Sequence, residues 1–308
     1  MEKFAIKLDI CLKIEGPNLF FEKFVFDKHY KLVSKSQITE EATIRIVLGT
    51  EISVTWDKED NLLTICCVEI DNSVLKLVNT MINSLIIKEL EHRKIYMLHA
   101  SCVYSKQKNR LIILFGDSGA GKTTVMLDLI KKYDLEYVSN GSTLVEFTPS
   151  GIKVLGSYKN GIKLRAFSIR EYDNLIFKKY FQDTSHLNKK EIFPNELGLP
   201  LASFNNFNAP TISFYFIKLS RSPFIINKDI NYRISMTLYN DIVRHIKFSE
   251  YYVEVNNKSI FIPSLDSEEL FQSRVSFVNH FLKNDYCGFI HGTLVDTINF
   301  IGEENGLL

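Results

Sequence analysis

The chain has 308 residues, of which 45% are hydrophobic and 24% charged, and its 37 basic residues nearly balance 36 acidic ones. This composition predicts a globular protein of one large or two ordinary domains, and a formal net charge of +1 gives no indication of a nucleic-acid-binding surface. Five cysteines without C-x-x-C spacing match neither a disulfide framework nor a zinc site, and no signal peptide or transmembrane run is evident. We therefore expect a cytoplasmic protein that binds neither nucleic acid nor membranes.

The first ninety residues are expected to form a β-rich module that ends in a connecting helix. Apolar residues at every second position of 4–14 predict one long strand. A second strand is expected over Ala42–Leu48, and two apolar segments around a polar turn predict a hairpin over 52–68. Apolar spacings of three and four then predict a helix over 73–92. These elements define an N-terminal domain of residues 1–90.

From residue 91 onward the predicted strands and helices alternate, which is typical of an α/β domain. The strands are expected at 95–98, 100–104, 111–115 and 135–138, with a hairpin over 144–155. The helices are expected at 123–133, 168–180, 237–248 and 267–282. We expect residues 91–308 to form one α/β domain with a mixed sheet.

The segment GDSGAGKTT directly follows a predicted buried strand and fits the phosphate-loop pattern G-x-x-x-x-G-K-[ST]. In such a loop, glycines let backbone N–H groups converge on phosphate oxygens, and the next helix adds the positive end of its dipole. Lys122 would contact the β- and γ-phosphates, while the hydroxyl of Thr123 would bind Mg²⁺. The loop thus predicts binding of a nucleoside triphosphate and Mg²⁺. The expected binding residues are Gly116, Asp117, Ser118, Gly119, Ala120, Gly121, Lys122, Thr123 and Thr124.

Proteins with this loop usually hold the metal with a second, acidic residue at the end of another strand. Asp296 follows two apolar residues, but it lies in a predicted C-terminal helix, where a surface charge is the favoured interpretation. Glu146 follows a short predicted strand and is the candidate metal ligand.

The run Leu98-His99-Ala100-Ser101, a turn, the strand at 111–115 and the GDSGAGKTT loop together resemble the nucleotide-binding domain of the HPr serine kinase family. The resemblance covers about residues 95–147, and the β-rich N-terminal part looks closer to stand-alone HPr-kinase-like proteins. It implies the P-loop fold shared with phosphoenolpyruvate carboxykinase. It also implies ATP-dependent phosphorylation of a hydroxyl group of a peptide, protein or small molecule. Lys122 and His99, which matches the family histidine near the phosphates, would be catalytic; a buried structural histidine would give the same sequence.

The chain departs from this family at the strand after the loop helix. The family has two aspartates there, as base and metal support, whereas this sequence has Asn140 and Gly141. An amide cannot accept a proton, but it can orient a hydroxyl group or a metal-bound water, so Asn140 stays a catalytic candidate. Besides the favoured phosphotransferase, two functions remain open: a nucleotide-binding regulatory or scaffold protein without transfer chemistry, and an NTPase that drives a partner. Homo-oligomerisation also remains open.

Other polar residues have simpler interpretations. A basic stretch after residue 156 is expected to be solvated surface rather than a phosphate clamp; it contains Lys159, Lys163, Arg165 and Arg170. His291 is expected at a strand end without a catalytic role, and Ser185-His186 lacks the acid of a hydrolase triad.

Overall fold

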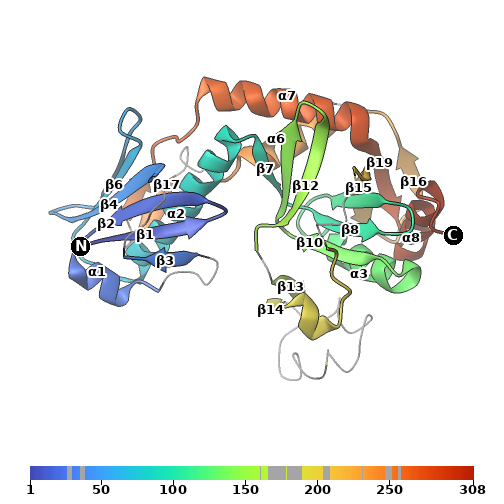
Figure 1. Ribbon diagram of the computed structural model, residues 1–308, viewed down its shortest axis with the longest axis horizontal. Coiled ribbons are helices and arrows are strands. Elements are labelled where there is room, and N and C mark those ends of the chain that lie inside the picture. Colours follow the sequence, from blue (N-terminus) through green and yellow to red (C-terminus); the bar gives the residue numbers. More distant parts are fainter. Residues whose placement is uncertain are drawn as a thin grey trace. The chain divides into compact units, whose positions relative to one another are not determined.

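The computed structural model describes residues 1–25, 30–34, 39–159, 161–165, 178, 189–203, 209–230, 232–246, 252–255 and 258–308. This part of the chain is an α/β protein with several sheets and six α-helices (Figure 1). It divides into two compact units, Met1–Tyr96 with Ile242–Arg274 and Met97–Asp241 with Val275–Leu308. None of the helices described is long and apolar enough to cross a membrane.

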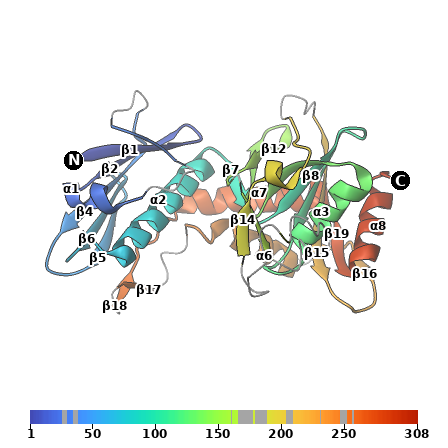
Figure 2. The ribbon, with the colours of Figure 1, turned by 90° about the horizontal axis from the view of Figure 1, so that it is seen from below.

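The first unit is built on a mixed six-stranded sheet of order β3-β1-β2-β4-β6-β5. Helix α2 packs against this sheet through a continuous apolar face (Figure 2), and the Asp71 carboxylate caps its first turn by accepting the N–H groups of Ser73 and Val74. The elements are β1 (Glu2–Lys7), β2 (Ile10–Glu15), α1 (Asn18–Lys23), β3 (Lys31–Val33), β4 (Ala42–Leu48), β5 (Ser53–Asp57), β6 (Leu62–Cys67), α2 (Asn72–His92), β17 (Tyr252–Val255) and β18 (Lys258–Phe261).

The prediction of one strand over 4–14 is wrong. Leu8 and Asp9 have φ of 53° and 62° and form a two-residue turn, across which β1 and β2 pair antiparallel. The register pairs Phe4 with Lys13 and Ala5 with Leu12, so the apolar residues of β1 and β2 lie on opposite faces of the hairpin. The turn is hidden in the sequence because a two-residue turn leaves the spacing of two unbroken while it reverses the face. The strand Ala42–Leu48, the hairpin over 52–68 and the helix over 73–92 are confirmed.

The second unit contains a six-stranded sheet of order β10-β8-β9-β15-β19-β16. Strands β9, β15 and β19 are parallel, β8 is antiparallel to β9, and β10 is antiparallel to β8. The elements of this sheet and its helices are β8 (Ser101–Ser105), β9 (Arg110–Phe115), α3 (Lys122–Tyr133), β10 (Glu136–Asn140), β15 (Thr211–Leu219), β16 (Ile225–Asn227), α6 (Tyr232–Val243), α7 (Glu268–Asp285), β19 (Tyr286–Gly292) and α8 (Leu294–Glu304). The smaller elements are β7 (Ile95–Leu98), β11 (Thr143–Thr148), β12 (Gly151–Ser157), β13 (Ile162–Arg165), β14 (Lys189–Ile192) and the 3₁₀ helix Pro194–Leu197.

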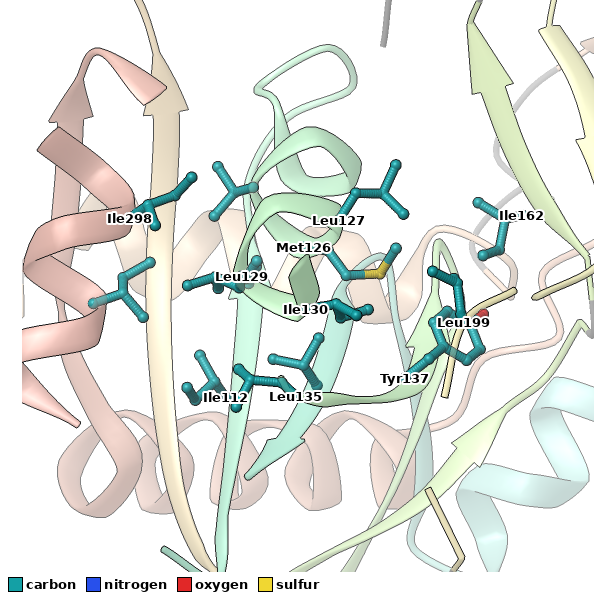
Figure 3. Packing of buried hydrophobic residues seen from close by; sticks show 14 of the residues in the cluster. Ile112, Met126, Leu127, Leu129, Ile130, Leu135, Tyr137, Ile162, Leu199 and Ile298 are labelled. Carbon is teal, nitrogen blue, oxygen red and sulfur yellow. The ribbon is translucent and has the colours of Figure 1, made fainter. Parts of the chain in front are cut away.

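Helix α3 is held on this sheet by a buried apolar cluster. Met126 and Ile130 of α3 pack in the same cluster as Ile112 of β9 and Leu135, and Ile298 of α8 joins it (Figure 3). Helices α3 and α8 lie side by side (Figure 2). This packing fixes the axis of α3 and therefore the position of its N-terminus, where the glycine loop ends.

Most predicted elements of the second unit are confirmed, namely the strands at 95–98, 100–104, 111–115 and 135–138, the hairpin over 144–155 and the helices over 123–133 and 267–282. The helix expected at 237–248 instead spans Tyr232–Val243, because its buried face begins at Ile234 and continues through Leu238 and Ile242. The helix expected at 168–180 lies outside the described residues.

The division into units differs from the expected domains 1–90 and 91–308, because residues 242–274 belong to the first unit. There β18 packs on β5, β17 packs on α2, and the fully buried Arg274 binds two acids. Its Nη1 donates to Glu91 Oε2 at 2.6 Å, and its Nη2 donates to Asp266 Oδ2 at 2.6 Å. Burial raises the pKa of Glu91 to about 7, although the attraction of Arg274 opposes this rise. The cluster thus joins distant parts of the chain at a high desolvation cost.

We expect Arg274→Met to lower the free energy of unfolding by roughly 3–5 kcal/mol, because it leaves the buried Glu91 and the partly buried Asp266 without their cation. Arg45→Met is the matched control, since Arg45 is 47% exposed in its ion pair with Glu15 and such pairs contribute about 1 kcal/mol or less. Chemical denaturation of both variants measures the difference, and equal losses would contradict the role given to the buried cluster.

Candidate nucleotide-binding site

The glycine loop lies at the edge of the second unit's sheet where the parallel strands end. It starts directly after Phe115, the last residue of β9, and Phe115 pairs with Phe216 of β15. On the other side Leu114 pairs with Ser101 of β8, which in turn pairs with Asn140 at the end of β10. Ligands of open α/β sheets bind at this carboxyl edge. The strand pairing thus brings the loop to the same edge as Asn140 and the Leu98–Ser101 segment.

Two positions of the loop accept only glycine. Gly116 has φ of 152°, and a Cβ there would lie 2.5 Å from the carbonyl oxygen of Ile217. Gly121 has φ of 98°, and its Cβ would lie 2.4 Å from Leu219 Cδ1. A hydrogen bond from Leu219 N to Ala120 O, at 2.9 Å, closes the loop against β15. Gly121 is also the N-cap of α3 and offers no side chain to the N–H groups of the first turn, a geometry that suits an anion.

Lys122 is buried, with 7% of its surface exposed, and its ammonium group lies within the loop. Its Nζ donates to the carbonyl oxygens of Gly116 at 2.6 Å and Asp117 at 3.1 Å. Asp117, Ser118 and Gly119 at the tip of the loop are exposed. The loop therefore holds a positive charge beneath a solvent-accessible tip, and phosphate oxygens could replace the two carbonyl partners.

Thr123 and Asn140 are in direct contact. Asn140 Oδ1 accepts the hydroxyl of Thr123 at 3.1 Å and that of Ser101 at 2.6 Å. An amide oxygen has two lone pairs, so these two donors occupy both of them. Because the Thr123 hydroxyl gives its proton to Asn140, its oxygen keeps its lone pairs as acceptors. Asn140 thus orients the Thr123 hydroxyl, and a further donor or a cation would have to compete with two hydroxyls to reach the amide oxygen.

His99 lies on the turn between β7 and β8, next to Gly141. Its ring nitrogen Nδ1 is 2.9 Å from the carbonyl oxygen of Gly141, which can only accept, so Nδ1 carries the proton. Its backbone N–H donates to Asp241 Oδ2 of α6 at 2.6 Å. Ala100 O accepts Gly141 N at 2.8 Å, which joins the two turns. No local pattern singles out Asp241, which lies in a helix far along the chain, and Ser101 appears in the sequence analysis only as the last residue of the Leu98–Ser101 run.

Glu146, the expected metal ligand, is the fourth residue of β11 rather than the last. Its Oε2 is 4.0 Å from Lys153 Nζ, and no contact with the glycine loop is found among the described residues. Asp296 lies exposed in the first turn of α8 and accepts the Thr293 hydroxyl at 2.7 Å, as expected of a helix-surface charge. Within the described ranges there is no group of three or more His, Cys, Asp or Glu residues that could hold a metal.

The remaining candidates contribute little to this site. Lys163 is exposed on β13, and His291 lies one residue before the end of β19, as predicted. Arg170, Ser185 and His186 lie outside the described residues. No protein-family model matches the chain, and no curated protein is significantly similar to it in sequence. We therefore infer the function from the residues of this site.

We expect Lys122→Ala to weaken ATP binding by about 100-fold, because removing the ammonium costs a few kcal/mol of phosphate stabilisation. Lys132→Ala is the matched control: it removes an exposed lysine from the last turn of the same helix. Calorimetric titration with ATP compares the two, and unchanged affinity in Lys122→Ala would exclude the loop as the phosphate site.

Proposed function

We propose that this protein is an ATP- and Mg²⁺-dependent phosphotransferase, similar to HPr-kinase-like proteins, acting on a hydroxyl group of a peptide, protein or small molecule. The observation that carries this proposal is the contact at Thr123. A hydroxyl at the start of the loop helix is held at 3.1 Å by Asn140 from a neighbouring strand end. Binding of an anion alone would not need this oriented hydroxyl. We therefore propose that it acts on the outer phosphates and their metal ion.

The residues of the loop fit a magnesium nucleotide. Mg²⁺ usually keeps several waters and binds one or two protein oxygens together with phosphate oxygens. Thr123 would supply such an oxygen, Asn140 would fix its direction, and the phosphates would supply the negative charge. When bound, the metal would neutralise charge on the β- and γ-phosphates. Lys122 would turn from the Gly116 and Asp117 carbonyls to the phosphate oxygens and stabilise the charge on the transferred group.

A second function is favoured by one observation. At the end of β10, Asn140 uses its amide oxygen for two hydroxyl donors, and Gly141 has no side chain. Neither residue can accept a proton from a substrate. If no other group does so, the protein is a nucleotide-binding regulatory or scaffold protein without transfer chemistry.

We expect EDTA to weaken the binding of ATP more than that of ADP, since Thr123 and the metal act on the outer phosphates. In Thr123→Val this difference should shrink, because the isosteric side chain lacks the hydroxyl. Thr80→Val, a helical threonine of the first unit, serves as the control. Titrations with and without EDTA measure the ATP and ADP affinities of all three proteins. An ATP affinity of the wild type that does not depend on the metal would count against a transfer site.

We expect acceptor-dependent ADP release from the wild type and from Asn140→Asp, but its loss in Asn140→Leu. A carboxylate can accept the hydroxyls of Ser101 and Thr123 as the amide does, whereas leucine leaves both unpaired in a buried site. The assay is ADP release with and without arrayed peptides that contain serine, threonine or tyrosine. If wild type and Asn140→Asp both bind ATP tightly and release no ADP with any acceptor, the binding-protein alternative replaces the phosphotransferase.

A further inference from the structure

Asp241 places a carboxylate next to His99, the residue whose ring contacts the strand end at which the chain lacks acidic residues. It lies near the end of α6, is half-buried, and accepts the backbone N–H of His99 at 2.6 Å. The two residues are 142 positions apart, so the contact is made by the tertiary fold. Charge-assisted hydrogen bonds of this kind are short and roughly twice as strong as neutral ones.

The same histidine presents its ring to the end of β10. Because Nδ1 donates to the Gly141 carbonyl at 2.9 Å, the neutral ring carries its lone pair on Nε2. An imidazole can accept a proton, which the amide of Asn140 cannot do. His99 therefore places a proton acceptor at the Asn140-Gly141 turn, and Asp241 places a negative charge at the backbone of that histidine.

A short series of contacts joins this pair to the phosphate loop. Gly141 directly follows Asn140, whose Oδ1 accepts the Thr123 hydroxyl at 3.1 Å. On the neighbouring strand, Ser101 lies two residues after His99 and donates to the same oxygen at 2.6 Å. A group that contacts the His99 ring is thus close to the hydroxyl that would face the metal and the outer phosphates.

We propose that Asp241 is a positioning residue of the transfer site, which replaces from α6 the charge missing at the end of β10. This inference rests on the proposed phosphotransferase function. His99 accepts the proton of the acceptor hydroxyl as its oxygen forms a bond to the γ-phosphorus. The bond from the γ-phosphorus to the β–γ bridging oxygen breaks, and its electron pair leaves on ADP. Asp241 stabilises the imidazolium, which then releases the proton to water.

A purely structural role makes a different prediction. If the His99 N–H needed only a hydrogen-bond acceptor, the amide oxygen of an asparagine would serve equally well. If the negative charge matters, asparagine fails and glutamate partly restores function. The decisive comparison is therefore Asp241→Asn against Asp241→Glu, with Asp296→Asn as the control at an exposed aspartate of the same unit.

The experiment measures ATP affinity by calorimetry, the melting temperature, and kcat and KM for acceptor-dependent ADP release. We expect Asp241→Asn to keep the melting temperature and the ATP affinity within about twofold of the wild type. Its kcat should fall at least tenfold, as part of the roughly 10²–10⁴-fold that general-base assistance contributes. Asp241→Glu should recover part of this loss. In a His99→Gln background Asp241→Asn should have no further effect, since the two residues act as a unit.

Full kcat in Asp241→Asn beside an active wild type would overturn this inference and leave the phosphotransferase proposal intact. A loss of ATP affinity or melting temperature that matches the loss of kcat would also overturn it, because the residue would then be structural. If the wild type itself binds ATP but releases no ADP with any acceptor, the proposed function fails, and the inference fails with it.

Discussion

The close approach of Gly116 to the end of β15 is the constraint on which the site depends. A side chain at this position would lie 2.5 Å from the Ile217 carbonyl oxygen, so only glycine lets the loop close against the sheet. The closed loop in turn starts α3 at Lys122, and the buried cluster on the other side of α3 fixes its direction. The positions of Lys122 and of the Thr123 hydroxyl are thus set by packing contacts that lie away from the glycine loop itself.

The charge balance around this loop is unusual for a metal-nucleotide site. Lys122 and the N-terminus of α3 are positive, whereas the neighbouring strand end offers the neutral amide of Asn140. The end of β10 therefore adds no carboxylate that would repel an anion or attract a free divalent cation. It follows that such a site would take up the metal together with its nucleotide, with the phosphates providing the charge.

The local parts of this site could be predicted from sequence, and the parts assembled over long distances could not. The loop pattern places Gly116–Thr124 because its chemistry is continuous in the chain, and the flanking strand and helix have clear periodicity. Glu146 was predicted as a metal ligand because it follows a short apolar segment. In the structure, β11 continues past Glu146, whose carboxylate lies 4.0 Å from the Lys153 ammonium. Asp241 carries no local signal, since a carboxylate on an amphipathic helix is ordinary until the fold sets it against His99. The β1–β2 turn was missed because the apolar spacing of two runs unbroken through it, although the pairing places the apolar residues of the two strands on opposite faces.

The hydrogen bonds around Asn140 bear on whether the site evolved for binding alone. A loop with a lysine and a helix N-terminus is sufficient to hold phosphate oxygens. Ser101, Asn140 and Thr123 add little to that task, and the first two are buried, where each polar group costs free energy unless it is paired. What their pairing achieves is a fixed direction for one hydroxyl, that of Thr123 at the start of α3. In the proposed phosphotransferase, such a fixed direction would serve discrimination between triphosphate and diphosphate, which simple phosphate binding does not require.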